Sequence, residues 1–230
     1  MQYILVTGSS KGIGRAIAIA LASVKTHLFI HGRDKDALAE TEKLVKDKGS
    51  SCSQIIADIS TTSGCNKLIE AVGQETLAVL VNNAAVGIVK PVEELTLDDW
   101  NRTIAVNITA PFILTKELLP QMKKGSSIVN ILSTAAKNAF PGWSSYCMSK
   151  FALRGFSDTL REELRPRGIR VIAVYPGATD TPIWDSVPGD WPRDKMMKAE
   201  EVAKAVAFAV SCPPSVLIED ITLGSLSGSL

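Results

Sequence analysis

The sequence predicts an α/β protein with a doubly wound, mostly seven-stranded parallel sheet and helices on both faces. Three observations predict this class. Short β-branched runs alternate along the chain with longer segments whose apolar residues recur at helical spacing. Early strand-like runs such as Ile4–Val6 and Val79–Val81 are apolar at every position, which is typical of strands covered on both faces. A repeated strand–helix–strand order then requires right-handed crossovers within one sheet.

The strands and helices can be assigned in order along the chain. Helical segments follow the first, second and fifth strands, with apolar spacing from Ile13, Leu38 and Phe151. Residues 96–123 are long for one helix, so we expect a capping pair at Thr96 and Asp99 and a kink at Pro111. The expected strands are Tyr3–Thr7, His27–His31, Ser53–Ala57, Ala78–Val81, Ser127–Leu132, Arg170–Val174 and Val216–Leu223.

The domain organisation follows from the same reading. Repeats and linkers are absent from the sequence, so residues 1–230 are expected to form a single cofactor-binding and catalytic domain. Residues 179–195 hold three Pro and two Trp and have little regular pattern. A segment this long without regular structure is usually functional, and we expect residues 179–198 to form a substrate loop or lid.

Composition excludes several classes of protein. The chain has 25 Lys+Arg and 24 Asp+Glu, so it lacks the basic excess of a nucleic-acid or membrane-surface binder. The apolar run 16–24 is much shorter than the ~20 residues of a membrane helix, and no secretory leader precedes the first strand. The four cysteines fit no zinc pattern, so no metal site is expected. A cytoplasmic protein is the resulting expectation.

A glycine motif, Gly8-x-x-x-Gly12-x-Gly14, joins the first strand to the first helix. Glycines allow a tight turn, and the helix N-terminus offers free N–H groups to a phosphate, so this position favours a dinucleotide site. The same stretch contains the Gly-x-Ser-x-Gly pattern of hydrolases. That interpretation requires a catalytic His late in the chain, whereas both histidines lie in the second strand. The phosphate-loop pattern of nucleotide hydrolases fails because Ile13 occupies its second Gly position.

A second group of residues has the composition of a proton-transfer site. Tyr146 and Lys150 are four residues apart and share one face of a helix. An ammonium beside a phenol lowers the phenol pKa from about 10 and makes it a usable acid near neutral pH. Ser133 follows the fifth strand, at the end of the sheet where ligands bind in open α/β folds.

Taken together and in register, these motifs resemble the classical short-chain dehydrogenase/reductase family over essentially the whole chain. The resemblance implies a Rossmann fold in which Tyr146 is the general acid, Ser133 bonds the substrate oxygen and Lys150 binds the nicotinamide ribose. It also implies that Asn107 holds a water in a proton relay. Tyr146–Phe151 and Thr181–Trp184 are similar to the sepiapterin-reductase and small-ketone-reductase branches. The implied cofactor-binding residues are Gly8, Ser10, Lys11, Gly12, Ile13, Gly14, Arg33, Asp58, Ile59, Asn82, Ala84, Tyr146, Lys150, Pro176, Gly177, Thr179 and Thr181.

The end of the second strand predicts which nicotinamide cofactor binds. NAD-specific sites place an acid there, but this chain has Gly32 followed by Arg33. A guanidinium matches a 2′-phosphate, and Lys11 can add a second positive charge, so we expect NADP(H) in preference to NAD(H). Asp34 is interpreted as the N-cap of the next helix.

The predicted activity is NADPH-dependent reduction of a ketone or aldehyde, or the reverse oxidation of an alcohol. A catalytically silent nucleotide-binding sensor and a 3-oxoacyl thioester reductase remain alternatives. The family resemblance also implies a homodimer or homotetramer. Apolar and aromatic residues are expected to line the pocket for a small carbonyl or alcohol substrate: Ala135, Phe140, Trp143, Ile183 and Trp184, with Trp191 nearby.

Overall fold

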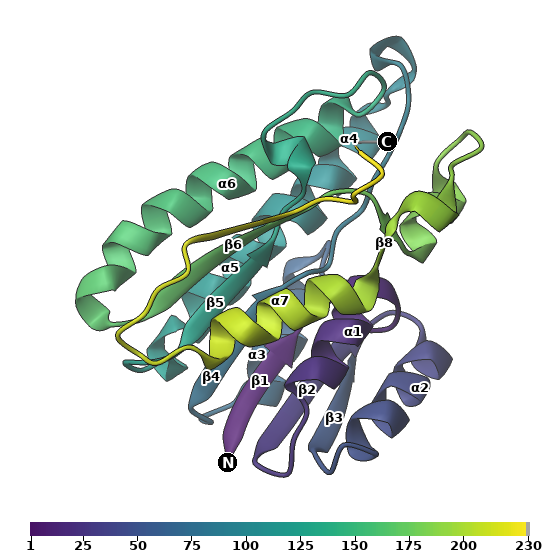
Figure 1. The fold of residues 1–230 in the computed structure, drawn as a ribbon. Coiled ribbons are helices and arrows are strands. Elements are labelled where there is room, and N and C mark those ends of the chain that lie inside the picture. The colour runs from purple at the N-terminus through teal and green to yellow at the C-terminus, as the bar shows by residue number, and fades with distance from the viewer. Residues whose placement is uncertain (229–230) are drawn as a thin grey trace.

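Seven parallel strands form one sheet with helices packed on both faces (Figure 1). The computed structural model describes residues 1–228. The strand order is β3-β2-β1-β4-β5-β6-β9, and every neighbouring pair is parallel. This arrangement confirms the predicted fold class. The strands are β1 (Gln2–Val6), β2 (Thr26–Gly32), β3 (Ser51–Ile56), β4 (Leu77–Asn82), β5 (Ser127–Ile131), β6 (Arg170–Pro176) and β9 (Asp220–Leu223).

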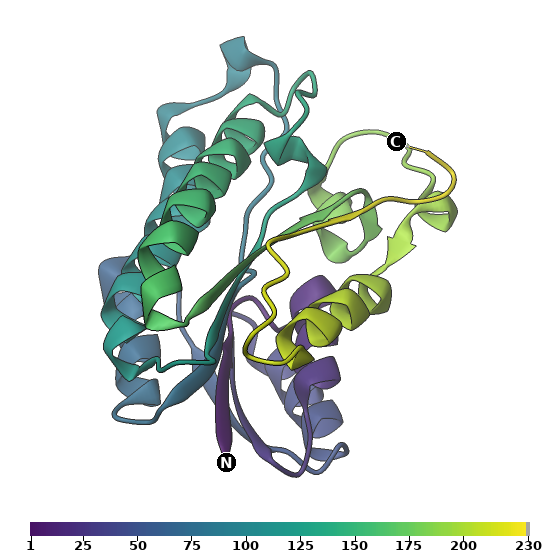
Figure 2. The ribbon, with the colours of Figure 1, turned by 60° about the vertical axis from the view of Figure 1, so that its left-hand side comes forward.

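The helices divide into two layers, one on each side of the sheet (Figure 2). Helices α1, α2 and α7 cover one face, where apolar side chains of β1, β2 and β6 meet those of α1 and α7. Helices α3 to α6 cover the other face and bury a second apolar cluster. Burial on both faces explains why the strand sequences lack polar alternation. The helices are α1 (Gly12–Leu21), α2 (Lys35–Lys46), α3 (Thr62–Val72), α4 (Leu97–Ile104), α5 (Ala110–Leu118), α6 (Ser144–Leu164) and α7 (Ala199–Ser211).

Two helix starts follow the chemistry expected from the sequence. Asp34 caps α2 by accepting a 3.0 Å hydrogen bond from the backbone N–H of Ala37. Thr96 and Asp99 form a reciprocal capping box at the start of α4. Each cap satisfies backbone donors that the first helical turn leaves unpaired, so these short polar side chains determine where the helices begin.

The predicted kink at Pro111 requires a correction. The backbone departs from α-helical geometry earlier, in a π-helical turn over Ala105–Thr109, and Pro111 lies in the first turn of α5. Proline has no N–H for the carbonyl four residues before it, which here belongs to Asn107. The π turn is therefore located where the regular hydrogen-bond ladder is interrupted. The last strand also begins later than expected, at Asp220.

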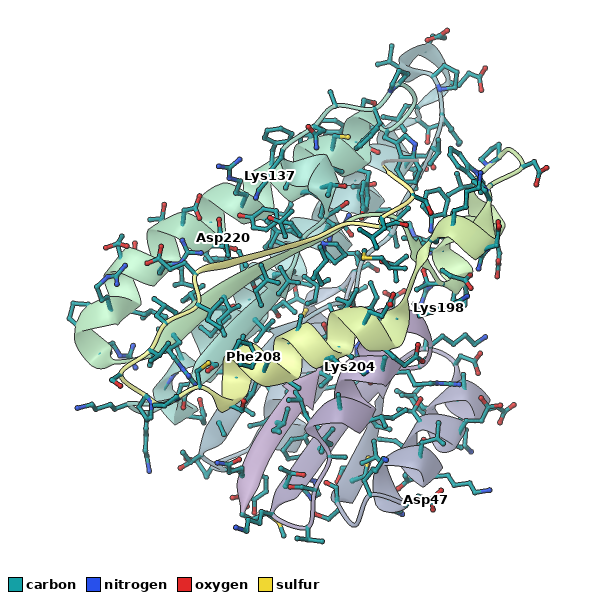
Figure 3. All side chains as sticks on the ribbon, viewed as in Figure 1. Asp47, Lys137, Lys198, Lys204, Phe208 and Asp220 are labelled. Atoms are coloured by element: carbon teal, nitrogen blue, oxygen red, sulfur yellow. The ribbon has the colours of Figure 1, made fainter. Side chains whose placement is uncertain are left out.

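The irregular segment after β6 lies beyond the carboxyl edge of the sheet, beside the start of α7 (Figure 1). Short strands β7 (Thr179–Asp180) and β8 (Met197–Lys198) pair at its base. Asp180 forms ion pairs with Arg193 at 2.6 Å and with Lys198 at 3.0 Å. Figure 3 shows Lys198 at this junction with α7. The segment is thus anchored at both ends. No helix among residues 1–228 has the length and apolar character needed to cross a membrane.

Candidate active site

A cavity of about 650 Å³ opens at the carboxyl edge of the sheet. It lies where the strand order reverses between β1 and β4, which is the position at which open α/β sheets bind ligands. The cavity is lined by the predicted site residues Gly8, Ser10, Lys11, Gly12, Ile13, Gly14, Arg33, Asp58, Ile59, Ala84, Ser133, Ala135, Phe140, Trp143, Tyr146, Lys150, Pro176, Gly177, Thr179, Thr181, Ile183 and Trp184. Of the predicted set, Asn82 and Asn107 are the two that do not line it.

The glycine loop at one end of the cavity has a shape that requires its glycines. Gly8 and Gly12 have φ of +64° and +56°, in the left-handed region that favours glycine. A side chain at Gly14 would collide with the carbonyl oxygen of Gly8. Asn83 secures the loop, because its Nδ2 donates to the carbonyls of Thr7 and Gly8 at 2.9 and 3.0 Å. These contacts hold the start of the glycine loop at the cavity.

This loop fits a phosphate-bearing cofactor by an observation independent of its sequence pattern. The buried hydroxyl of Ser10 lines the cavity and has no hydrogen-bond partner among the described residues. Buried polar groups are normally paired, so an unpaired hydroxyl in a ligand cavity indicates a polar ligand atom. The N-terminus of α1, with its free N–H groups, lies at the same place.

The residues at the end of β2 lie at the cavity, and an ion pair between Lys11 and Asp34 lies beside them. Gly32 carries no acid, and a side chain there would meet the hydroxyl of Ser10. Arg33 is exposed and lines the cavity. Lys11 forms an ion pair with Asp34 at 3.3 Å, while the same carboxylate caps α2. The hydrogen bonds from Ala37 and Lys11 lower the pKa of Asp34.

Three polar side chains meet on the opposite wall of the cavity. Ser133 follows β5, while Tyr146 and Lys150 extend from the first two turns of α6. The Ser133 hydroxyl accepts from the backbone N–H of Ala135 at 3.1 Å, and its interaction with Tyr146 lowers the pKa of that phenol. The Lys150 ammonium lies 5.5 Å from the centre of the Tyr146 ring and donates to the carbonyl of Ile131 at 2.9 Å. The structure thus brings together the predicted acid and its two partners.

The direction of the Tyr146 pKa differs from the sequence expectation. Burial raises the pKa of Tyr146 to about 12, although the Ser133 hydroxyl acts to lower it. Burial also lowers the pKa of Lys150 to about 7. Lys150 donates to a backbone carbonyl and not to the Tyr146 oxygen. Burial away from water penalises the charged tyrosinate and the charged ammonium alike. The sequence reveals the pairing of these groups but not how deeply they are buried.

Asn107 does not line the cavity, and its side chain has structural partners. Its Oδ1 accepts from the backbone N–H of Val86 at 2.8 Å, while Nδ2 donates to the carbonyl of Val86 and the hydroxyl of Ser149. Ser149 in turn donates to the carbonyl of Tyr146 at 2.7 Å. The Asn107 amide therefore connects the loop after β4 to the helix that carries Tyr146.

The structure places the Asn82 side chain outside the cavity. Its side chain is buried between β4, β5 and α5, where it donates to Asn130 and Thr115. The next residue, Asn83, lines the cavity and holds the glycine loop. The two adjacent amides point to opposite sides because strand side chains alternate. The sequence alone does not show which of the two amides faces the cavity.

The part of the cavity nearest Ser133 and Tyr146 is apolar and aromatic. Trp143 packs edge-on against Tyr146 and Trp184, with ring centroids 5.3 and 5.8 Å away. Trp191 lies 4.8 Å beyond Trp184, and it joins the five predicted wall residues in lining the cavity. The Trp184 indole N–H is satisfied by the carbonyl of Thr179, so its ring presents an apolar surface.

Comparisons with known proteins agree with this fold. A family model described as short chain dehydrogenase matches residues 2–190. Sepiapterin reductase of Chlorobaculum tepidum is 35% identical over 242 residues, covering 100% of this chain and 98% of that protein. An alcohol dehydrogenase from Thermococcus sibiricus, complexed with 5-hydroxy-NADP, has a TM-score of 0.89 at 27% identity and covers 100% of this chain and 99% of its own.

A ketoreductase structure extends the same comparison. Angucycline C-6 ketoreductase LanV with bound NADP has a TM-score of 0.86 at 28% identity and covers 96% of this chain and 93% of its own. The doubly wound sheet and the glycine loop define a Rossmann-type oxidoreductase fold. The chain belongs to the classical short-chain dehydrogenase/reductase family.

Proposed function

We propose that the protein is an NADP(H)-dependent oxidoreductase that reduces a ketone or aldehyde carbonyl, or oxidises the alcohol in reverse, with Tyr146 as general acid/base. The observation that carries this proposal is the meeting of Ser133, Tyr146 and Lys150 in the same cavity as the glycine loop. A bound nicotinamide would supply the hydride. The protein's task is to position both reactants and deliver a proton.

The chain's own residues divide this task between them. Tyr146 donates its phenolic proton to the carbonyl oxygen, and Ser133 holds that oxygen through its hydroxyl. Lys150 binds the ribose hydroxyls and, when charged, stabilises the tyrosinate left behind. Asn107 holds the Tyr146 helix in place through Ser149, and we propose that it also holds a water in a proton relay through Lys150. Hydrogen bonds from the cavity walls thus act on the oxygen where negative charge develops.

The proposed preference for NADP(H) has two supports. Arg33 lines the cavity next to Gly32, where NAD-specific sites place an acid, and Lys11 lies near it. Asp34, the carboxylate that follows Arg33 in the sequence, is engaged in capping α2 and pairing with Lys11. Bound NADP in the LanV structure is consistent with the same choice. The residues proposed to hold the cofactor are those of the predicted set that line the cavity, with Asn83 replacing Asn82 as the residue that fixes the loop.

The proposed substrate is an uncharged, flat or apolar carbonyl compound. Trp143, Trp184, Phe140 and Ile183 line the cavity around the catalytic group, and Ala135 leaves room beside it. Lys137, the one cation in the stretch between Ser133 and Tyr146, is bonded to Thr222 and stacked over Tyr175, and is not a lining residue. The apolar and aromatic lining residues named above include no Arg or Lys that could pair with an anionic acyl thioester carrier, which disfavours the 3-oxoacyl thioester alternative.

The chain is further proposed to act as a single domain, with residues 179–198 as its lid, and to assemble as a homodimer or homotetramer. Phe112 of α5 and Phe151 of α6 are exposed large apolar side chains on neighbouring helices. Phe112 packs edge-on against Phe156 at 6.3 Å. An exposed aromatic group of this kind is suited to self-association. Cytoplasmic location stays a prediction of the sequence.

Replacement of the proton donor tests the proposed activity. We expect Tyr146→Phe to abolish NADPH-dependent reduction of a panel of neutral ketones and to leave NADPH binding intact, as measured by nucleotide fluorescence. Tyr175→Phe is a matched control, because this buried phenol has no hydrogen-bond partner among the described residues. Wild-type protein that binds NADPH but turns over no carbonyl would instead favour the sensor alternative.

A further inference from the structure

His31 of β2 connects two loops through the two nitrogens of one buried imidazole. The backbone N–H of Gly8 donates to Nδ1 at 3.2 Å, and Nε2 lies 3.2 Å from the carbonyl oxygen of Ala57. A carbonyl oxygen can only accept, so Nε2 carries the proton. Nδ1 accepts from an N–H, so it must be bare. Both contacts together require the neutral Nε2–H tautomer.

The two loops that His31 connects lie at the same end of the cavity. Gly8 is the first glycine of the loop at the start of α1. Ala57 immediately precedes Asp58 and Ile59, which line the cavity after β3. His31 itself is 3% exposed and also lines the cavity. Its backbone is held as well, because Ser9 N–H donates to its carbonyl at 2.8 Å.

We propose that His31 is a positioning residue for the nucleotide, and that its neutral imidazole fixes the spacing between the glycine loop and the Asp58 loop around the adenosine half. The inference rests on the proposed nucleotide-binding function. A site already held in its binding geometry loses less entropy when the ligand binds, so release of either loop weakens affinity. Hydride and proton transfer take place at the other end of the cavity, so we expect their rate at saturating nucleotide to change little.

Protonation of the imidazole would undo the arrangement. A proton on Nδ1 would face the Gly8 N–H and replace an attractive contact with two opposed donors. Burial and the Arg33 guanidinium lower the pKa of His31, to about 4, while the Ala57 carbonyl and Asp58 carboxylate oppose this shift. Hydrogen bonding from Ser60 lowers the pKa of Asp58. The imidazole is therefore neutral near pH 7, and nucleotide affinity is expected to fall in acid.

Side chains that reproduce one nitrogen at a time can test this role. His31→Asn keeps an acceptor near the position of Nδ1, His31→Gln keeps a donor near that of Nε2, and His31→Leu keeps neither. His27→Asn is the matched control, because His27 lies on the same strand but pairs with Ser51 and Ser53 away from the cavity. The probes are NADP⁺ and NAD⁺, with dissociation constants from titration of tryptophan fluorescence. NAD⁺ lacks the 2′-phosphate, which itself titrates near pH 6.

For His31→Leu we expect roughly tenfold weaker binding of both nucleotides at pH 7, as for the loss of one to two net hydrogen bonds. His31→Asn and His31→Gln should each lose less, and kcat at saturating nucleotide should stay within about twofold in all three. Wild-type affinity for NAD⁺ should fall as the pH is lowered from 5.5 to 3.5, across the pKa of His31, and the fall should be smaller in His31→Asn. Circular dichroism confirms that each variant is folded at the pH used.

The outcomes separate the inference from the function on which it rests. If wild-type protein binds neither nucleotide, the proposed function fails. If wild-type protein binds but His31→Leu binds equally well, or His27→Asn is weakened as much, the positioning role is overturned. An identical acid dependence in wild type and His31→Asn overturns the role of the imidazole proton.

Discussion

The buried ammonium of Lys150 should lower the free energy of unfolding of the protein, and the Lys150→Met variant should therefore be more stable than the wild type. The side chain is 2% exposed, and burial lowers its pKa from 10.5 to about 7. At about 1.4 kcal/mol for each pKa unit, this difference corresponds to roughly 5 kcal/mol of unfavourable free energy when the folded protein carries the charge. Methionine is unbranched and apolar, so it can occupy the same space without this penalty.

The expected net gain is smaller, because the substitution also removes a contact. Lys150 donates to the carbonyl of Ile131 at 2.9 Å, and a charged hydrogen bond contributes about 1.5–3 kcal/mol. The difference leaves a free energy of unfolding about 2–3 kcal/mol higher for Lys150→Met. For a chain of this length that corresponds to a melting temperature roughly 5–10 °C higher. The variant should at the same time lose carbonyl reduction, since the ammonium is gone.

The dependence on pH separates a charge effect from better packing. The unfolded chain keeps the Lys150 proton up to about pH 10.5, whereas the folded protein releases it near pH 7. Wild-type stability from this group is therefore lowest below pH 7 and rises as the pH rises toward 10.5. The advantage of Lys150→Met should be full at pH 6 and largely lost at pH 9.5.

Urea unfolding followed by circular dichroism at pH 6, 8 and 9.5, without added nucleotide, provides the measurement. Lys204→Met, on the exposed face of α7, is the control and should change stability little at any pH (Figure 3). Lower stability of Lys150→Met at every pH would refute the reasoning. A constant gain across the three values would also do so, by showing that charge burial is not its source.

Two further predictions concern recognition. Arg33→Asp should weaken NADPH binding at least tenfold and leave NADH binding equal or stronger, because a carboxylate repels the 2′-phosphate but can bond a ribose hydroxyl. Fluorescence titration measures both affinities, and equal losses for the two nucleotides would contradict this prediction. Trp143→Ala should raise KM for a bicyclic aromatic ketone roughly tenfold and change KM for acetone little, because it removes a flat apolar contact beside Tyr146. Steady-state kinetics with both substrates measures this, and equal changes in KM for the two ketones would show that Trp143 only supports the fold.

The sequence predicted the sheet almost completely because burial on both faces leaves a clear signal. All seven expected runs are strands, and their errors lie at the ends, where propensity is weakest. The last strand begins at Asp220 although its apolar pattern starts at Val216, after Pro213 and Pro214. Pairing with β6 over Ala173–Pro176 decides where this strand begins, and a strand partner cannot be read from local pattern.

Asn82 and Asn107 show the limit of sequence reasoning about the site. Motif and spacing identify residue types correctly, but the direction of a side chain depends on what packs against it. Asn82 faces Asn130 and Thr115 in the core, and Asn107 faces Val86 and Ser149. Both amides therefore stabilise the frame of the site from outside the cavity.

The same limit explains why His31 could not be assigned from the sequence. In one dimension it is a histidine within a strand, 23 residues from Gly8 and 26 from Ala57. Parallel strands bring the segments after β1 and β3 to either side of the end of β2, because β2 lies between them in the sheet. A ring with two nitrogens can contact both loops, and an aliphatic residue would satisfy the strand pattern equally well. The proposed role of His31 therefore depends on the order of the strands in the sheet. Its test must measure nucleotide affinity, because a variant can fold normally and still lose this role.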